Sequence, residues 1–293
     1  MKPTIITDEY IKQKIKKRAS DTHKGDYGKL MLFVTSIGMP GAGVLCAKAA
    51  LRSGAGLVRL AVPQGNYSVV ASRIPEPVYT LLPQNECGTA CISSLDILSD
   101  IQKQSDAQLI GCGLGRHEDI EKLVDFLLKN TKIPTVLDAD GINAILKNIL
   151  VLKEVNAPLI ITPHEAEMAR LINKTPKEVH ENRLEIATDF SKKYNATVVL
   201  KGKNTLISQP NGQVFMCEKG NAGMATGGSG DVLSGIIVSL LGQGLSAADS
   251  AVCGAYIHAY AGDLASCTLS EYAMLPTDII NFLPNAFLSI VSS

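Results

Sequence analysis

Residues 221–231 read Asn-Ala-Gly-Met-Ala-Thr-Gly-Gly-Ser-Gly-Asp, and an apolar helical pattern, Val232–Leu241, follows at once. Four glycines in eleven residues allow the backbone to approach a ligand closely. The first N–H groups of a helix have no partner within it, and the helix dipole adds positive character at the same end. The segment therefore predicts an anion site, most naturally for a phosphate. The alternative is a flexible turn in which Asp231 only caps the helix.

Two common phosphate motifs do not fit the sequence. A Walker A loop requires Gly-Lys-Ser/Thr, which does not follow these glycines. Neither this segment nor Gly38–Gly43 has the context or spacing of a dinucleotide fingerprint, so a Rossmann assignment fails.

Upstream, short apolar runs alternate with longer helical patterns. The runs are compact and bounded by turn residues, as strands buried on both faces are; they are Leu30–Thr35, Leu57–Val62, Gln108–Gly111, Thr135–Asp138, Leu159–Thr162 and Thr197–Lys201. The helical patterns are Gly43–Ser53, Ile120–Lys129, Glu165–Ile172 and Lys177–Tyr194. The alternation predicts an α/β fold with a mainly parallel central sheet covered by helices on both faces.

The C-terminal part of the chain has a different character. Gln209–Gly212 is turn-like and joins two strand patterns, Thr205–Ser208 and Gln213–Cys217, into a predicted hairpin. Helical patterns follow at Val232–Leu241, Ala247–Ala265 and about Thr277–Leu288. No linker or internal repeat interrupts the sequence, so we expect one domain over residues 1–293. The first 25 residues are expected to form a short, basic helical arm outside the core pattern.

Composition narrows the class of protein. The chain has 293 residues, 46% of them hydrophobic, which excludes wholesale disorder. Lys and Arg total 28, as do Asp and Glu, so no basic excess exists to bind nucleic acid. The seven cysteines are dispersed and odd in number, which indicates reduced thiols. The sequence does not contain two Cys/His pairs with the short, fixed spacing of a structural zinc site, so we do not expect one. Without a leader or a sufficiently long apolar run, we expect a cytoplasmic protein and no membrane span.

Polar clusters follow several predicted strands, where ligands bind in open α/β sheets. Lys201-Gly202-Lys203-Asn204-Thr205 places a lysine at a strand end, either to reach a phosphate or as an exposed loop residue. His164 and Glu167 are three residues apart at a helix start, so they could face one ligand, with Mg²⁺ near Glu167. Alternatively, His164 packs on an apolar neighbour and Glu167 is a surface acid.

Two carboxylates, Asp138 and Asp140, close another strand. If the strand continues, both side chains lie on the same side. Two carboxylates so close together indicate a bound cation, a hydrogen-bonding substrate or one carboxyl of raised pKa. Otherwise one of them caps the next helix. The loops Gly38–Gly43 and Gly111–Gly115 expose bare backbone at the same edge. His258 lies in an apolar helix, which favours a core histidine, and Cys112 has no base in its loop to make it a nucleophile.

In this order, the segments resemble the ADP/ATP-dependent NAD(P)H-hydrate dehydratases of the ribokinase-like superfamily, from about Lys24 to Ala265. Gly223–Leu233 is the most specific segment, and with Thr162-Pro163-His164 it distinguishes this family from sugar and vitamin kinases of the same fold. The chain departs from the family where Cys112 replaces the usual Pro and where Pro40 precedes Gly41-Ala42. It has no room for the epimerase domain often fused to this module, so the resemblance implies the stand-alone bacterial form.

The resemblance implies repair of nicotinamide cofactors whose dihydropyridine ring has added water. The S form of hydrated NADH or NADPH (NADHX, NADPHX) would be phosphorylated on its ring hydroxyl by ADP or ATP, and phosphate would then be eliminated. ADP would be converted to AMP by the loss of its terminal phosphoryl group. The alternatives are a thiazole- or pyrimidine-type alcohol kinase of the same superfamily, or a nucleotide-sensing protein that has lost catalysis.

The resemblance also implies roles for individual residues. Asp231 would accept the hydroxyl proton, with Gly228 and Gly230 stabilising the transferred group through their backbone. A helix N-terminus is expected to lower the pKa of Asp231, so that orientation would matter more than basicity. The nucleotide would be held by Lys201, Gly202, Lys203, Asn204, Thr205 and Gly230. The hydrated cofactor would be held by Ala42, Gly113, Gly115, His164 and Asp231. Mg²⁺ would bridge the phosphates with Glu167 ordering its water, and a homotetramer is expected; Asp138, Asp140 and His258 receive no role.

Overall fold

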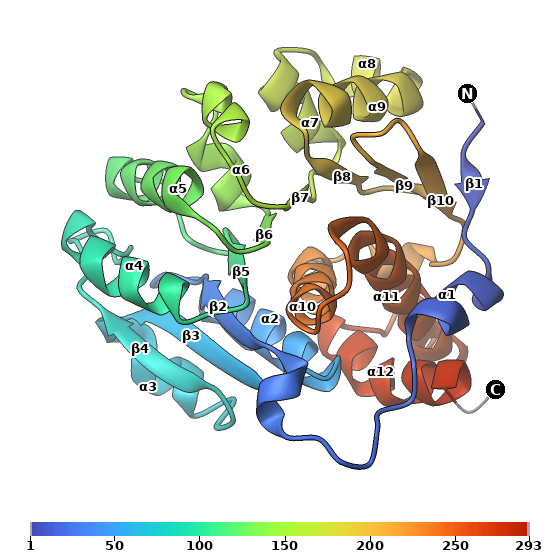
Figure 1. The fold of residues 1–293 in the computed structure, drawn as a ribbon, viewed down its shortest axis with the longest axis horizontal. Helices are drawn as coiled ribbons and strands as arrows, with labels where there is room; N and C mark the ends of the chain where they lie inside the picture. Colours follow the sequence, from blue (N-terminus) through green and yellow to red (C-terminus); the bar gives the residue numbers. More distant parts are fainter. Residues whose placement is uncertain (1, 292–293) are drawn as a thin grey trace.

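The computed structural model describes residues 2–291, in which one ten-stranded sheet has the order β1-β10-β9-β8-β7-β6-β5-β2-β3-β4 (Figure 1). Strands β2 to β8 run parallel to one another, whereas β9 is antiparallel to both β8 and β10 and forms a hairpin with β10. The strands are β1 Thr4–Ile5, β2 Lys29–Phe33, β3 Leu57–Pro63, β4 Val78–Leu82, β5 Ala107–Ile110, β6 Thr135–Leu137, β7 Leu159–Ile161, β8 Thr197–Leu200, β9 Thr205–Ser208 and β10 Val214–Cys217. The predicted mainly parallel sheet and its hairpin are confirmed.

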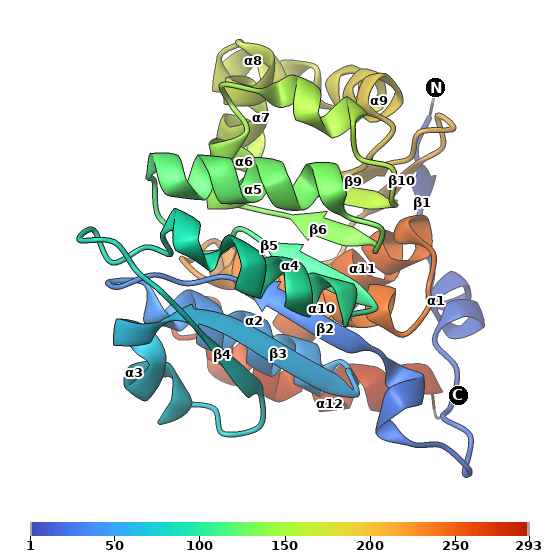
Figure 2. The ribbon, with the colours of Figure 1, turned by 60° about the vertical axis from the view of Figure 1, so that its left-hand side comes forward.

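Helices cover both faces of this sheet (Figures 1 and 2). They are α1 Asp8–Lys14, α2 Pro40–Arg52, α3 Tyr67–Ala71, α4 Leu95–Lys103, α5 Glu118–Asn130, α6 Asp140–Ala144, α7 Glu165–Ile172, α8 Pro176–Glu181, α9 Arg183–Tyr194, α10 Ser229–Gly242, α11 Ala247–Leu269 and α12 Pro276–Val291. Successive side chains of β2 alternate between faces: Leu30 and Leu32 join the core with α2, α10, α11 and α12, whereas Met31 and Phe33 join the core with α4, α5, α7 and α9.

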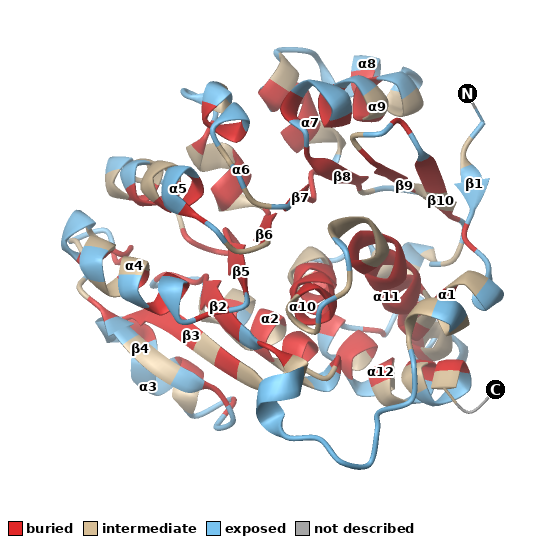
Figure 3. Cartoon of the chain, viewed as in Figure 1, coloured by how far each residue is buried: buried red, intermediate tan, exposed pale blue. Residues whose placement is uncertain are grey.

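Burial explains why the pattern along the sequence was readable (Figure 3). The central strands are buried on both faces, so they are continuous apolar runs. The outer helices α4 and α5 are buried on one side and exposed on the other. By contrast, α10 is buried almost all round because α2, α11 and the sheet surround it.

Two predicted features were wrong in detail. Lys177–Tyr194 is not one helix: α8 ends before Asn182, whose backbone (φ −127°, ψ 30°) leaves the helical region, and α9 begins at Arg183. The N-terminal arm is helical at α1, but it does not lie outside the core. Ile11 is fully buried, and β1 adds to the sheet beside β10, because the arm covers apolar residues at the hairpin edge.

Within residues 2–291, no helix combines the length and the hydropathy that crossing a membrane requires.

Candidate active site

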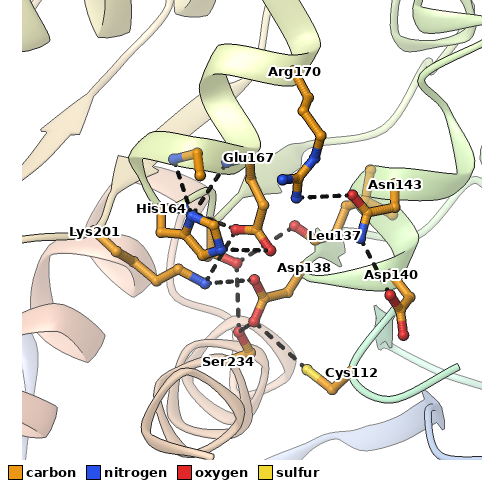
Figure 4. A network of polar contacts seen from close by, with 12 residues as sticks. Cys112, Leu137, Asp138, Asp140, Asn143, His164, Glu167, Arg170, Lys201 and Ser234 are labelled. Carbon is orange, nitrogen blue, oxygen red and sulfur yellow. Dashed lines mark hydrogen bonds and ion pairs between the residues drawn. The ribbon is translucent and has the colours of Figure 1, made fainter. Parts of the chain in front are cut away.

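Four parallel strands deliver the predicted polar clusters to one edge of the sheet. Cys112 follows β5, Asp138 follows β6, His164 follows β7 and Lys201 follows β8, and Ser234 of α10 contacts Asp138 in the same network (Figure 4). Parallel neighbours end at the same edge, so residues far apart in sequence meet there.

Asp138 lies at the centre of this network. It is buried, accepts hydrogen bonds from Lys201 Nζ at 2.8 Å and Ser234 Oγ at 2.7 Å, and has the Cys112 thiol at 3.6 Å (Figure 4). Burial alone would raise the pKa of Asp138, but the Lys201 ammonium and the hydroxyl donors outweigh it and lower the pKa below its usual range. Asp138 is therefore an ionised, fully paired carboxylate, which suits a positioning role better than proton transfer.

Asp140 does not share this environment. The strand ends at Leu137, and Ala139 takes a positive φ of 48°, so the chain turns between the two carboxylates. Asp140 begins α6 and accepts a hydrogen bond from the Gly115 N–H at 2.9 Å. The expectation that the strand carries both carboxylates to one side is thus wrong, because the chain turns before Asp140.

Lys201 is not an exposed loop lysine. Its side chain is 19% exposed, and its ammonium pairs with Asp138 and lies 3.7 Å from Glu167 Oε2. A Cβ added to Gly230 would lie 3.4 Å from Lys201 Nζ. The ammonium therefore stands directly beside the glycine-rich segment, and a Cβ at Gly230 would come into van der Waals contact with it.

The glycine-rich segment presents unpaired backbone donors. Gly228 adopts φ 98° and caps α10, which begins at Ser229, three residues before the predicted start. Among the residues that the structure describes, the N–H groups of Gly228, Gly230 and Asp231 donate to no protein acceptor. A Cβ on Gly227 would meet nothing within 4 Å. Three free donors at a helix N-terminus with open space before them fit the predicted anion cradle.

His258 supports this segment from behind. It is buried, as predicted for a core histidine, and its Nε2 lies 3.3 Å from Ser229 Oγ. Burial lowers the pKa of His258 to about 4, so the ring is neutral at physiological pH. A neutral ring fixes the first residue of α10 without adding charge to the cradle.

Asp231 is the unusual carboxylate of the site. Burial, followed by the charge of Asp138, raises the pKa of Asp231 to about 6, although Cys112 and Lys201 oppose the shift. The expected lowering by the helix N-terminus is therefore wrong, because desolvation outweighs it. Two neighbouring carboxylates with pKa values pushed apart are typical of sites where one orients and the other carries a proton.

His164 and Glu167 contact each other at the start of α7. His164 Nδ1 accepts hydrogen bonds from the Ala166 and Glu167 N–H groups, which assigns the proton to Nε2, 3.5 Å from Glu167 Oε1. Burial lowers the pKa of His164 despite the nearby Glu167. Glu167 is buried rather than a surface acid, because its Oε2 accepts the His164 N–H at 2.8 Å and faces Lys201.

The predicted substrate loops also meet at this edge. A Cβ on Gly113 would lie 2.7 Å from the Ala42 Cβ, so the loop after β5 touches the first turn of α2. Ser36 Oγ donates to the Gly113 carbonyl at 2.8 Å, and a Cβ on Gly115 would lie 3.4 Å from the same hydroxyl oxygen. Ser36 was missed in the sequence because it lies in the loop after β2 without a charged neighbour.

The predicted nucleotide loop divides into two parts. Lys201 joins the central network, whereas Gly202, Lys203 and Asn204 are exposed and Thr205 is half-buried. Arg183 of α9 donates to the Lys203 and Leu200 carbonyl oxygens and so holds the loop from outside. Ser234 was also missed, although it lies one turn after Asp231 on α10.

Comparison with known proteins identifies the family. The sequence profile of the NAD(P)H-hydrate dehydratases matches residues 30–285. The chain belongs to the NAD(P)H-hydrate dehydratase family. The match spans strands β3 to β10, nearly all of β2, the glycine-rich segment and most of α12, so every element of the candidate site lies within it.

Curated relatives of the family cover most of this chain. A bifunctional NAD(P)H-hydrate repair enzyme Nnr from Moorella thermoacetica is 41% identical over 280 residues, which is 96% of this chain and 53% of the relative. An ADP-dependent (S)-NAD(P)H-hydrate dehydratase from Neisseria meningitidis is 38% identical over 256 residues, 85% of this chain and 81% of the relative. The chain thus spans about half the length of several of the relatives it matches.

Solved structures show the same fold. A Bacillus subtilis ADP/ATP-dependent NAD(P)H-hydrate dehydratase, co-crystallised with ATP and Mg²⁺, aligns with a TM-score of 0.84, 25% identity and 99% coverage of both chains. A ribokinase-like superfamily protein from Enterococcus faecalis aligns with a TM-score of 0.86 and 26% identity over 99% of this chain and 97% of that one. The fold is ribokinase-like.

Proposed function

We propose that this protein uses ADP to dehydrate the S form of hydrated NADH and NADPH, with AMP and phosphate as the other products. One observation carries the proposal: Asp231, a partly buried carboxyl of raised pKa, stands in the first turn of α10 with three free backbone N–H groups, and the Lys201 ammonium lies beside Gly230 of the same turn. Phosphoryl transfer needs a proton acceptor, an oxyanion cradle and a cation in this arrangement. The family and its named relatives supply the substrate class.

Hydroxide is a poor leaving group, so the ring hydroxyl is first phosphorylated. Asp231 orients this hydroxyl and accepts its proton as the oxygen attacks the terminal phosphoryl group. The Gly228, Gly230 and Asp231 N–H groups hold the phosphoryl oxygens, and Lys201 offsets their charge. The lone pair of the ring nitrogen then expels phosphate, which restores the dihydropyridine. The kinase fold thus performs a dehydration because the phosphorylated hydrate that it forms loses phosphate.

The residues fit a Mg²⁺ ion held mainly through phosphates and water. Magnesium keeps most of its water ligands and takes one or two carboxylates. Among the described residues, Glu167 Oε1 pairs with the His164 ring alone, at 3.5 Å, and can therefore accept a metal-bound water, whereas both oxygens of Asp138 are occupied. When bound, Mg²⁺ would offset the negative charge of the phosphates. His164, Ala42, Gly113 and Gly115 would then face the hydrated cofactor.

The test is a repair assay with purified protein, hydrated NADPH and ADP. Return of the reduced-nicotinamide absorbance with stoichiometric AMP supports the proposal, and the same assay with ATP and with hydrated NADH ranks the substrates. Accumulation of a stable phosphorylated alcohol from a thiazole or pyrimidine, with no NADPH recovered, would instead indicate a kinase. Asp231→Asn is the matched control, because it preserves the fold and removes the proton acceptor.

Assembly and location complete the proposal. We expect a cytoplasmic homo-oligomer, most simply a tetramer. Light scattering on the purified chain measures its molar mass and so tests the oligomeric state. A monomeric mass at micromolar concentration would contradict this part without affecting the chemistry.

A further inference from the structure

Two thiols converge on the proposed proton acceptor. The Sγ atoms of Cys46 and Cys112 and a carboxylate oxygen of Asp231 all lie within 4.8 Å of one another. The three residues come from α2, from the loop after β5 and from the first turn of α10. Their spacing in sequence gives no sign of this cluster, which only the packing of α2 on α10 creates.

The packing holds the cluster in place. Gly235 lies one turn after Asp231, and a Cβ there would stand 2.5 Å from the Cys46 carbonyl oxygen, so α2 and α10 are in close backbone contact at this point. The Cys112 carbonyl oxygen accepts a hydrogen bond from the Thr35 N–H at 2.7 Å, which holds the loop after β5 in place. Both thiols are buried, whereas Asp231 is partly exposed and opens toward the cradle.

We propose that Cys46, Cys112 and Asp231 form an inhibitory site for Zn²⁺ or another soft divalent cation. Zinc prefers thiolate, imidazole and carboxylate ligands in a tetrahedron, and Mg²⁺ does not compete for sulfur. With Zn–S bonds of about 2.3 Å, neighbouring sulfurs stand about 3.8 Å apart, so small side-chain rotations bring the three donors into range. The fourth position remains open to water on the exposed side of Asp231.

Binding changes the chemistry of the site in a defined way. Two S–H bonds break and their protons leave to solvent, while two Zn–S bonds and one Zn–O bond form. The carboxylate of Asp231 then no longer accepts the substrate proton. This consequence rests on the function proposed above, whereas the binding itself does not.

Cys46→Ser tests the site, and Cys253→Ser is the matched control. Serine is close to cysteine in size, Cys46 lies outside the proposed catalytic contacts, and Cys253 is an equally buried free cysteine on α11. Equilibrium dialysis against buffered free Zn²⁺ measures stoichiometry and affinity, and Co²⁺ gives thiolate charge-transfer absorption only if sulfur coordinates it. Thermal melts of both variants establish that they are folded.

We expect one zinc per chain in the wild type and in Cys253→Ser, with an affinity at least about 100-fold weaker in Cys46→Ser, since even outer contacts to a metal site are worth 10- to 100-fold. Repair activity should fall in proportion to zinc occupancy and survive in Cys46→Ser. Absence of cobalt–thiolate absorption in the wild type, or unchanged zinc affinity in Cys46→Ser, overturns the proposal. Zinc bound to a fully active enzyme also overturns it, whereas a chain that binds zinc but never repairs hydrated NADPH refutes the proposed function alone.

Discussion

Asp231→Asn should stabilise the protein while abolishing its activity. The pKa of Asp231 stands at about 6 in the folded chain against an ordinary 3.8, because burial and Asp138 penalise the charged form. Between these two values the folded state holds more protons than the unfolded state, so stability falls as pH rises from about 4 to about 6. Each pKa unit is worth 1.36 kcal/mol, so ionised Asp231 costs about 3 kcal/mol at pH 7.

The neutral amide removes this cost, and we expect the free energy of unfolding to rise by up to about 3 kcal/mol at pH 7, or about 5 °C in Tm for a chain of this size. The gain should shrink to about 0.5 kcal/mol at pH 4 and vanish below about pH 3, where Asp231 is protonated in both states. Turnover should fall at least 100-fold, the usual contribution of a general base. Urea unfolding at pH 7 and pH 4, with the repair assay beside it, measures both effects.

Asp249→Asn provides a control of opposite sign. Burial opposes ionisation of Asp249, but hydrogen bonds from Tyr10, Lys14 and Ser246 outweigh it and lower the pKa of Asp249. Its stabilisation is present above the ordinary pKa and is lost as pH falls, so the amide should destabilise at pH 7 without changing repair activity. If Asp231→Asn has no stability gain at pH 7, or an equal gain at pH 4, the argument from desolvation is refuted.

Three further outcomes follow from the site. The repair rate should be half-maximal near pH 6 and fall tenfold per pH unit below it, because Asp231 must be ionised; a flat profile in kcat/KM from pH 5 to 8 contradicts this. Lys201→Met should destabilise by about 3–5 kcal/mol and weaken nucleotide more than hydrated cofactor. Most of that stability should return in the Lys201→Met, Asp138→Asn double variant, as urea unfolding can check. Gly230→Ala should lower kcat about 100-fold, the cost of misplacing reacting groups by about 1 Å, because the added Cβ takes up space beside the Lys201 ammonium; its melting temperature should stay close to that of the wild type.

Much of the fold was predictable because the central strands are buried on both faces. Continuous apolar runs such as β2 and β8 carry that burial directly in the sequence. The edge strand β4 was missed because its side chains are half-exposed and its pattern resembles a loop. The break between α8 and α9 was missed because both halves are helix-forming, although Thr175-Pro176 with Glu178 forms a capping box that marks the start of α8.

The site was predictable as a set of clusters but not as a network. The rule that ligands bind at strand ends brought Asp138, His164 and Lys201 to one edge. It did not reveal that Asp138 and Lys201 pair, because that contact joins residues 63 positions apart. The pKa of Asp231 could not be foreseen either, since the desolvation that raises it depends on how α10 packs against α2 and the sheet.

The central claim is that the first turn of α10 holds the transferred phosphoryl group while Asp231 faces the attacking oxygen. A crystal structure of the protein with ATP and Mg²⁺ tests it most directly. The account predicts the terminal phosphate within hydrogen-bond distance of the Gly228, Gly230 and Asp231 N–H groups and beside Lys201 Nζ. A terminal phosphate bound elsewhere, for example in the cavity of about 710 Å³ lined by Lys24, Lys29 and Arg59, would contradict it.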